Sequence, residues 1–444
     1  MRPTQFPRHL WPLSVHFFRG RLFLGPHDLA SLARRLGAPL YIYDLATLEW
    51  AISAYRHGLR AWPGPGLITY AAKAWLSLPL VQLLARRGLG FDVVSLGELE
   101  MVQRGGADPR RVHLHGNNKS PELLNRAADA GVGGIVVDNL HELSLLEAMT
   151  PPAALPLWLR LNPDQSPETH AYRQTGHAGS KFGLSWEEAQ TAARRIARAP
   201  HLRLTGLHAH IGSQFFELTP LFRAIDRLAE LAAWVQREGL GEIRVLSPGG
   251  GLGVPYHPED PAPPLAETVA QLSRYAARAW QTRVGTPHPT LALEPGRSLI
   301  ARAGLALYTV GAVRPLPDGS RILAVDGGMS DNLRPALYGA RYTAALAHAP
   351  LGDSVGPARI VGPLCESGDF LIDRIHLPPA RAGDILAIPV SGAYHLSMAS
   401  NYNGMLRPAV WLHARGHLLP MQRRETLADL LHRDIPLENP THLR

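Results

Sequence analysis

The sequence predicts a (β/α)8 barrel, similar to a TIM barrel, followed by a second, mainly antiparallel β domain. Between residues 67 and 297, eight short apolar runs each end in polar or glycine residues, and the first five start about 22 residues apart. Helical patterns separate these runs, and strands that alternate with helices in this way are typical of a parallel barrel. From about residue 300 onward, short apolar runs are separated by Gly and Pro turns, which indicates an antiparallel sheet.

The barrel is expected to contain eight strands with helices between them. The strands are predicted at Leu67–Ala71, Gly90–Val94, Val112–His115, Gly134–Val137, Leu155–Leu161, Leu202–His210, Ile243–Leu246 and Thr290–Leu293. Helices are predicted, from apolar residues at steps of three or four, at Leu76–Arg87, Glu98–Arg104, Pro121–Ala130, Trp186–Ala199 and Leu221–Glu238. A doubly wound open sheet is the alternative, but eight units over so long a span favour the barrel.

The remaining residues are expected to form a β-sandwich or β-barrel-like domain. Its strands are predicted at Leu305–Val313, Arg321–Val325, Ala358–Val361, Asp384–Pro389 and Pro408–His413. Two N-terminal runs, Val15–Phe18 and Arg21–Leu24, would add a hairpin to it. The predicted domains are therefore a barrel over residues 41–300 and a β domain over residues 1–40 and 301–444. The Pro-rich segment Tyr256–Leu265 is expected to be a surface loop.

The composition excludes several classes of protein. No run of about 18 apolar residues occurs in the 444 residues, so we expect no transmembrane helix, and the N-terminus lacks the apolar centre of a signal peptide. The net charge of +8 comes from scattered arginines, so we expect no nucleic-acid binding. The single cysteine, Cys365, cannot form an internal disulfide, which fits a reducing cytoplasm. A lone cysteine is most often a small buried apolar residue.

Only three of the 45 basic residues are lysines: Lys73, Lys119 and Lys181. So strong a bias toward arginine reflects genome composition, and a lysine retained against it is a candidate for chemistry that arginine cannot do. Arginine stays protonated, whereas a desolvated lysine amine can bond to an aldehyde. Lys73 is the strongest candidate because it directly follows the first barrel strand.

Polar residues gather at the C-terminal ends of the predicted barrel strands, where such barrels carry their chemistry. A single histidine there is usually structural, but so many polar residues at one face indicate a functional site. In chain order they are Lys73, Asp92, Ser95, His115, Asn117, Asp138, Arg160, Asn162, His208, His210, Gly249–Gly251, Glu294 and Arg297.

This set meets the needs of a pyridoxal 5'-phosphate site. Lys73 can bind the cofactor aldehyde as an imine, and the glycine-rich run Ser247–Gly253 can place backbone N–H groups around the phosphate. Glu294 can keep the pyridine nitrogen protonated, which makes the ring a strong electron sink. Either His208 or His210 can cover the ring. A metal site on His208, His210 and Glu294 is the alternative, and no metal is expected. No serine-hydrolase, zincin or P-loop motif is present.

Ten motifs together resemble the pyridoxal-phosphate enzymes of the alanine-racemase-like fold type, and within them the diaminopimelate decarboxylases. The resemblance covers about residues 20–430. The motifs are YAAKA (70–74), FDVVSLGEL (91–99), HGNNKS (115–120), KFGLS (181–185), GLHAHIGSQ (206–214), GGGLG (249–253), EPGR (294–297), VDGGMSDNLRPALYGA (325–340), CESGD (365–369) and GAYHLSMASNYN (392–403). The sequence departs from the commonest pattern at Trp75, Leu96 and Ser247-Pro248, which lie beside the expected ligands.

The resemblance implies a role for each matching residue. Lys73 would bind the cofactor covalently, His210 would stack on its ring, and Cys365 would donate the proton to the product. The full set of cofactor-binding residues would be Lys73, His210, Ser213, Gly250, Gly251, Glu294, Pro295, Gly296, Arg297 and Tyr394. The substrate-binding residues would be Arg297, Arg334, Tyr338, Glu366 and Tyr394.

The resemblance also implies an activity and an assembly. The expected reaction is decarboxylation of meso-2,6-diaminopimelate to L-lysine and CO2, the last step of lysine biosynthesis. The expected assembly is a homodimer with shared active sites, in which the partner supplies the CESGD loop. The alternatives are a decarboxylase for arginine, ornithine or carboxynorspermidine, an amino-acid racemase, and a non-catalytic cofactor-binding protein. Glu294 argues against the racemase, which usually places arginine against the pyridine nitrogen.

Overall fold

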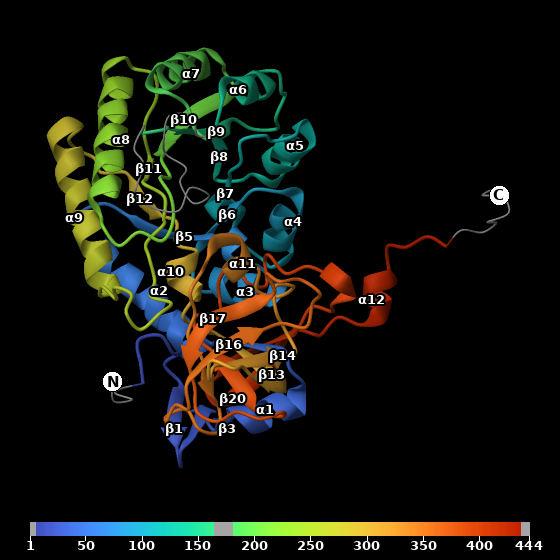
Figure 1. Ribbon diagram of the computed structural model, residues 1–444. Coiled ribbons are helices and arrows are strands. Elements are labelled where there is room, and N and C mark those ends of the chain that lie inside the picture. The colour runs from blue at the N-terminus through green and yellow to red at the C-terminus, as the bar shows by residue number, and fades with distance from the viewer. Residues whose placement is uncertain (1–5, 164–180, 437–444) are drawn as a thin grey trace.

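Eight parallel strands close into a barrel in the computed structural model, which describes residues 6–163 and 181–436. The order around the barrel is β10-β11-β12-β5-β6-β7-β8-β9, so the strands follow one another in chain order (Figure 1). Their bounds are Gly66–Ala71 (β5), Gly90–Val93 (β6), Val112–Leu114 (β7), Gly134–Val137 (β8), Leu155–Arg160 (β9), Leu202–His208 (β10), Val245–Ser247 (β11) and Thr290–Leu293 (β12). The predicted barrel and each of its eight predicted strands are confirmed.

Most of the barrel helices begin where short polar side chains cap them. Ser95 accepts a hydrogen bond from the backbone N–H of Glu98, and Ser77, Ser120, Asn139 and Ser185 cap their helices in the same way. The five predicted helices are present. The helices are Leu45–Leu59 (α2), Leu78–Ala85 (α3), Leu96–Arg104 (α4), Pro121–Ala130 (α5), Leu140–Glu147 (α6), Trp186–Arg198 (α7), Thr219–Arg237 (α8), Leu265–Arg283 (α9) and Arg297–Ile300 (α10).

The largest side chain inside the barrel wall, Trp158 of β9, fits because its neighbours are glycines. A Cβ on Gly206 of β10 would lie 2.5 Å from the Trp158 ring, and a Cβ on Gly134 of β8 would lie 2.7 Å from it. Protein interiors leave no room for such overlap. These two glycines therefore allow a fully buried tryptophan between adjacent strands.

The second domain is built on a nine-stranded, mostly antiparallel sheet below the barrel in Figure 1. Its main path is β17-β16-β14-β13-β4-β19-β20, with β18 and β15 attached through β13. The strands are Leu40–Asp44 (β4), Gly304–Pro315 (β13), Arg321–Val325 (β14), Ala345–Leu346 (β15), Pro357–Val361 (β16), Phe370–His376 (β17), Ile385–Ile388 (β18), Ala409–Ala414 (β19) and His417–Gln422 (β20). The short helices are Leu29–Leu36 (α1), Arg334–Tyr338 (α11) and Leu427–Leu431 (α12). All five strands predicted for this domain are present.

Two N-terminal elements do not belong to the sheet or domain that was predicted for them from the sequence. The predicted hairpin forms from Val15–Phe18 (β1) and Arg21–Leu24 (β2), but with His27–Asp28 (β3) it makes a separate three-stranded sheet. All of strand β4 except its first residue, Leu40, lies within the range assigned to the barrel, yet the strand pairs with β13 and β19. Its five consecutive buried residues resemble a barrel strand in sequence. We therefore propose that the domain boundary follows Asp44.

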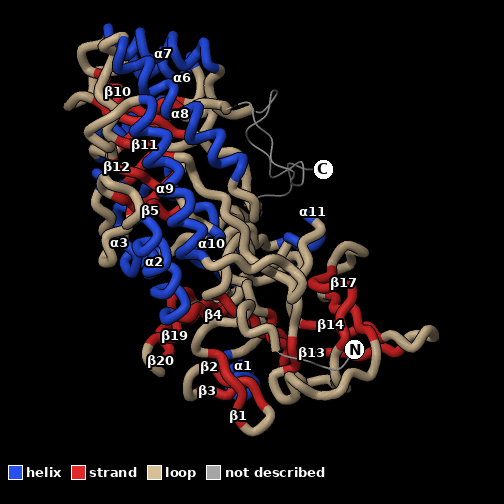
Figure 2. Tube along the Cα trace, turned by 90° about the vertical axis from the view of Figure 1, so that its left-hand side faces the viewer, coloured by secondary structure: helices blue, strands red, loops and turns tan. Residues whose placement is uncertain are grey.

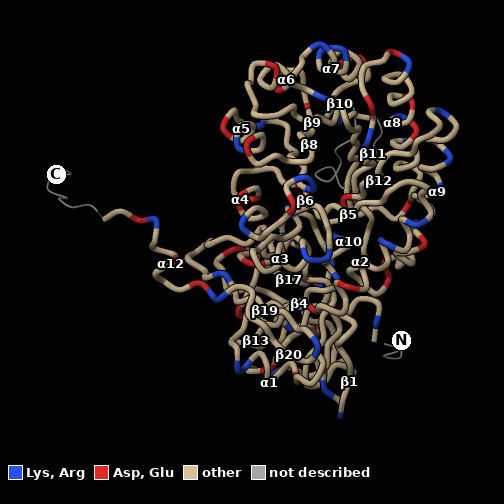
Figure 3. The backbone as a smooth tube through the Cα atoms, turned by 180° about the vertical axis from the view of Figure 1, so that it is seen from behind, with Lys and Arg blue, Asp and Glu red and all other residues tan. Residues whose placement is uncertain are grey.

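The cavity described below lies where the two domains meet. The trace in Figure 2 shows α10 and α11 close to the junction between the barrel and the β domain. Lys and Arg are spread over both domains with Asp and Glu among them (Figure 3). Within residues 6–163 and 181–436, no helix is long and apolar enough to span a membrane.

Candidate functional site

A cavity of about 370 Å³ lies at the C-terminal ends of the barrel strands. The structure brings together there most of the polar residues that follow these strands in the sequence. From the barrel they are Lys73, Asp92, His115, Asn117, Arg160, His208, His210, Ser213, Gly251, Glu294, Gly296 and Arg297, and Tyr394 joins them from the β domain. The closure of the barrel explains this, because it places the ends of parallel strands in one ring.

Lys73 lies on the short helical turn Ala72–Ala74 that follows β5. Its neighbours Ala72 and Ala74 are buried, whereas Lys73 itself is exposed and lines the cavity. The backbone N–H of Tyr394 donates to the carbonyl oxygen of Ala74 at 2.7 Å, and Ser397 Oγ donates to the same oxygen at 3.2 Å. The β domain therefore fixes the turn that carries this lysine.

Trp75, which departs from the family pattern, follows the same turn. Its ring stacks on that of Tyr43 in β4, with centroids 4.3 Å apart and the planes within 6°. The hydroxyl of Tyr70 donates to the Trp75 carbonyl oxygen at 2.7 Å. Trp75 therefore contributes to the contact between the domains.

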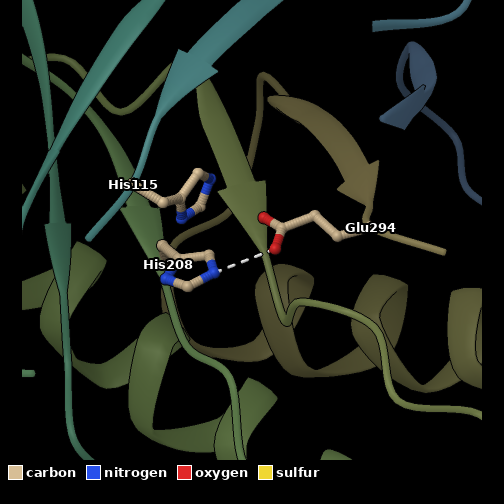
Figure 4. Close-up of side chains that lie close together, drawn as sticks. All are labelled: His115, His208 and Glu294. Atoms are coloured by element: carbon tan, nitrogen blue, oxygen red, sulfur yellow. Dashed lines mark hydrogen bonds and ion pairs between the residues drawn. The ribbon is translucent and has the colours of Figure 1, made fainter. Parts of the chain in front are cut away.

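Glu294 is a buried carboxylate with two hydrogen-bond partners. Ser247 Oγ donates to Glu294 Oε1 at 2.5 Å, and His208 Nε2 lies 3.1 Å from Glu294 Oε2 (Figure 4). Burial, with the neighbouring charge of Asp92, raises the pKa of Glu294 to about 7. Burial lowers the pKa of His208 to about 3, so this ring is neutral and its Nε2–H donates to Glu294.

A second carboxylate, Asp92, lies between two buried histidines of the neighbouring strand. His113 Nδ1 lies 3.2 Å from Asp92 Oδ1, and His115 Nε2 lies 3.4 Å from the same oxygen without hydrogen-bond geometry. Burial would raise the pKa of Asp92, but the two histidines outweigh it and lower the pKa to about 2. Asp92 is therefore an anion at neutral pH, which disfavours ionisation of Glu294.

Three of these side chains also resemble a metal site. One donor atom from each of His115, His208 and Glu294 lies within 4.8 Å of the other two (Figure 4). The alternative drawn from the sequence placed His210 in such a site, but the clustered residue is His115. The hydrogen bond between His208 Nε2 and Glu294 Oε2 uses a pair of atoms that a metal would need. The donor set thus suits a polar ring, with which Glu294 can share a proton, better than a cation.

The glycine run forms a cradle that no larger residue could occupy. A Cβ on Gly250 would lie 2.0 Å from the carbonyl oxygen of Glu294. Gly251 has a φ of +99°, and its Cβ would lie 2.2 Å from the carbonyl oxygen of Gly212. The adjacent Ser213 Oγ accepts hydrogen bonds from Arg297 Nε at 3.3 Å and Nη2 at 3.2 Å. A loop that only glycine can form, a hydroxyl and a guanidinium therefore meet at one wall of the cavity, and such a wall suits an anion.

Some residues expected in the site do not line this cavity. Arg334 at the start of α11 is buried behind the wall, and Tyr338 at the end of that helix is partly buried. Gly250 and Pro295 belong to the backbone around the cavity. Cys365 and Glu366 are exposed on the loop between β16 and β17, where Glu366 accepts a hydrogen bond from the Tyr402 hydroxyl. The lone cysteine is therefore not a buried apolar residue.

Several residues at the site were not predicted from the sequence, although Phe182 and His395 lie within quoted motifs. Tyr256 belongs to the predicted surface loop, but it is 6% exposed and its hydroxyl accepts a hydrogen bond from Arg297 Nη1 at 2.8 Å. Phe182 lines the cavity with its ring 4.4 Å from the Arg160 guanidinium. Tyr342 and His395 lie behind the wall. Only the position of Tyr256 just after the GGGLG motif could have suggested its role.

The other two lysines do not line the cavity. Lys119 is buried, and its Nζ donates to Glu142 at 2.8 Å and to the carbonyl oxygens of Gly116 and Val136 at 2.7 Å. Such an ammonium is fully satisfied and structural. Lys181 is exposed, 5.0 Å from the Phe182 ring centroid.

Comparisons with known proteins agree with this geometry. Residues 45–301 match a family model described as pyridoxal-dependent decarboxylase, pyridoxal binding domain. A diaminopimelate decarboxylase of Bacillus subtilis is 38% identical, with 94% of this chain and 96% of that protein covered. The crystal structure of the M. jannaschii diaminopimelate decarboxylase in complex with L-lysine has a TM-score of 0.87 and 31% identity, and covers 97% of this chain and 99% of its own.

Proposed function

Because the chain belongs to the family of pyridoxal-dependent decarboxylases, we propose that it converts meso-diaminopimelate to L-lysine and CO2, the last step of lysine biosynthesis. The observation that carries the substrate class is a pair of arginines, Arg297, which lines the cavity, and Arg334, which is buried behind its wall. Among the described residues, neither forms an ion pair with Asp or Glu. Two uncompensated guanidinium groups suit an amino acid with a carboxylate at its distal end.

The protein uses pyridoxal phosphate, and the side chains of the cavity fit it. We propose that Lys73 binds the aldehyde covalently, because it is the one lysine that lines the described cavity. The phosphate fits the cradle that only glycine can form, and Glu294 fits the ring nitrogen. When bound, the cofactor supplies an electron sink for the electrons of the broken carbon–carboxylate bond.

The remaining cofactor contacts are proposed for residues around the same cavity. Glu294, held by Ser247 and His208, would share a proton with the ring nitrogen. Because His208 is already bonded to Glu294, we propose that His210 covers the ring. The proposed phosphate-binding and neighbouring residues are Ser213, Gly250, Gly251, Pro295, Gly296, Arg297 and Tyr394.

The distal end of the substrate carries an ammonium and a carboxylate. We propose that Arg297, Arg334 and Tyr338 bind the carboxylate, that Glu366 binds the ammonium and that Tyr394 contacts both cofactor and substrate. The Arg297 guanidinium lies 4.7 Å from the ring centroid of Tyr394, so these two side chains share one side of the cavity. Charges of both signs would thus select meso-diaminopimelate over ornithine, which has no distal carboxylate.

We propose a homodimer in which the partner's loop completes each site. Cys365 and Glu366 are exposed and do not line the cavity of their own chain, although the proposed chemistry needs both. The end of the chain carries three exposed apolar side chains, Leu427, Leu431 and Ile435. It projects from the β domain in Figure 1, as a segment that packs on a second copy would. The single cysteine supports a cytoplasmic location.

The activity is tested with purified protein and three amino acids. Release of CO2 and L-lysine from meso-diaminopimelate is expected to require added pyridoxal phosphate, and ornithine and arginine are expected to be inert. Bound cofactor without lysine formation from meso-diaminopimelate would disprove the substrate. Equal turnover of ornithine would instead indicate a decarboxylase that does not require a distal carboxylate in its substrate.

The shared site is tested through Cys365. Replacing Cys365 by alanine should slow turnover by about 10²–10⁴-fold, because the product carbanion loses its proton donor, while the cofactor stays bound. Mixing this variant with Lys73→Ala subunits should then restore about a quarter of the wild-type activity, because random pairing gives one intact site in half of the dimers. If the mixture stays inactive although mixed dimers form, Cys365 does not act across the interface.

A further inference from the structure

A chain of buried polar side chains runs from behind the wall of the cavity into the β domain. It begins at Arg334, passes through Tyr342, His395 and Tyr41, and ends at Asp331. All five side chains belong to residues that are at most 3% exposed. Buried polar groups are costly unless each has a partner, so a complete chain of this length indicates a specific structural purpose.

The donors and acceptors of this chain have one consistent order. Arg334 Nη1 can only donate, so the Tyr342 hydroxyl accepts from it at 2.5 Å and gives its own proton to His395 Nε2, 2.8 Å away. The proton of a neutral His395 is then on Nδ1, which lies 3.3 Å from the Tyr41 hydroxyl. Tyr41 donates in turn to Asp331 Oδ2 at 3.0 Å.

The charges at the two ends agree with this order. Burial keeps the pKa of His395 well below its usual value, and the charges of Arg334 and Arg297 lower it further. Burial raises the pKa of Asp331 to about 6, which leaves it ionised at neutral pH. The cation Arg334 and the anion Asp331 are thus linked through three neutral groups and not by direct contact.

Arg297, like Arg334, contacts a neutral aromatic side chain, and Tyr256 lies against both arginines. The Arg334 guanidinium lies 4.8 Å from the ring centroid of Tyr256, and the hydroxyl of Tyr256 accepts from Arg297 Nη1 at 2.8 Å. The rings of Tyr256 and Tyr342 also pack nearly perpendicular to each other, with their centroids 5.2 Å apart. Neutral rings and hydroxyls therefore hold both guanidinium groups without cancelling their charge.

We propose that Tyr342 and His395 are positioning residues that hold Arg334 behind the cavity wall as a cation without a direct acidic partner, so that the site selects ligands with a distal carboxylate. The inference rests on the proposed function, because it explains how the proposed active site recognises the distal carboxylate of its substrate. An aspartate in direct contact with Arg334 would compete with the substrate carboxylate. An apolar residue at position 342 would leave the guanidinium free to turn away.

The test compares two ligands that differ by one carboxylate. L-Lysine carries the distal carboxylate and cadaverine lacks it. The ratio of their dissociation constants therefore measures how strongly the site prefers a ligand with that carboxylate. Both are titrated into holoenzyme while the visible absorbance of the bound cofactor is followed. Tyr342→Phe is expected to weaken L-lysine binding about tenfold, with cadaverine changed by less than about twofold. KM for meso-diaminopimelate should rise while kcat stays within about threefold.

Two further variants separate positioning from packing. His395→Gln should shift the ratio in the same direction, and it serves as the test if Tyr342→Phe does not fold. Tyr308 is the matched control, because its hydroxyl donates to Asp331 Oδ2 at 2.5 Å and lies 3.0 Å from the Tyr41 hydroxyl, but Tyr308 does not lie between Asp331 and Arg334. Tyr308→Phe should leave the ligand preference within about twofold of wild type.

The possible failures are distinct. If Tyr342→Phe or, where it does not fold, His395→Gln keeps the wild-type preference for L-lysine, the positioning role is wrong and the proposed function stands. A Tyr308→Phe variant that loses the preference equally would show general loosening of the domain and would also overturn the role. If the wild-type holoenzyme does not prefer L-lysine to cadaverine, the proposed substrate is wrong and the inference fails with it.

Discussion

Replacing Lys73 by alanine is expected to reduce decarboxylation by at least about 10³-fold and to abolish covalent attachment of the cofactor. The amine lies on a turn fixed between β5 and the β domain, because Ala74 accepts hydrogen bonds from Tyr394 and Ser397. Of the three lysines in the chain, Lys119 is held by Glu142 and Lys181 does not line the cavity. No other described lysine can therefore replace Lys73.

The measurement is mass spectrometry of peptides after reductive trapping of the holoenzyme, together with its visible spectrum. Lys73→Arg keeps the positive charge but cannot bond to the aldehyde, so it separates charge from covalent attachment. Lys181→Arg is the control and should retain activity within about twofold. A Lys73→Ala protein that still carried the trapped cofactor on another lysine would overturn the assignment.

Glu294→Gln is expected to lower kcat by about 10²–10³-fold while the cofactor remains attached. The amide keeps the shape of the side chain and a hydrogen bond, but it has no charge with which to keep the ring nitrogen protonated. Glu294→Asp keeps the charge and should retain more activity than the glutamine variant. If glutamine and glutamate were equally active, Glu294 would not act on the ring nitrogen.

The same variant should change how cofactor affinity depends on pH. Burial raises the pKa of Glu294 to about 7 in the protein alone, so the carboxylate that attracts the ring is ionised above about pH 7 and neutral below it. Affinity should therefore weaken as the pH falls through about 7. Glu294→Gln should remove this component and leave only that of the cofactor itself. His208 does not confuse the result, because its pKa is about 3.

Much of the fold followed from local patterns. The alternation of apolar runs with helical stretches predicted all eight barrel strands, because each run had to be buried against the next. The capping serines and prolines explain where helices such as α5 begin. The sheet to which β4 belongs was not visible locally, because a fully buried strand has the same sequence character in either domain.

The candidate site was predictable where the barrel topology arranges it. Residues that directly follow strands, such as Lys73, His208 and Glu294, meet because the barrel closes. Tyr256, Tyr342 and His395 come from loops with no periodic pattern. Tyr256 and Tyr342 lie outside the quoted motifs, and the motif that contains His395 does not show which side chain it contacts. The contact of Arg334 with the Tyr256 ring exists only because the β domain packs over the barrel.

The sequence by itself therefore determined the barrel, the family resemblance and the ring of polar residues at its mouth, because these depend on local periodicity and on short motifs. Only the tertiary structure decided which histidine bonds to Glu294 and how the two arginines keep their charge. Those features depend on side chains from segments distant in sequence, such as His208 with Glu294 and His395 with Tyr342, brought within hydrogen-bond distance by burial. The tertiary structure was also needed to show that Cys365 does not line the cavity of its own chain. A sequence motif does not show where in the folded chain its residues lie.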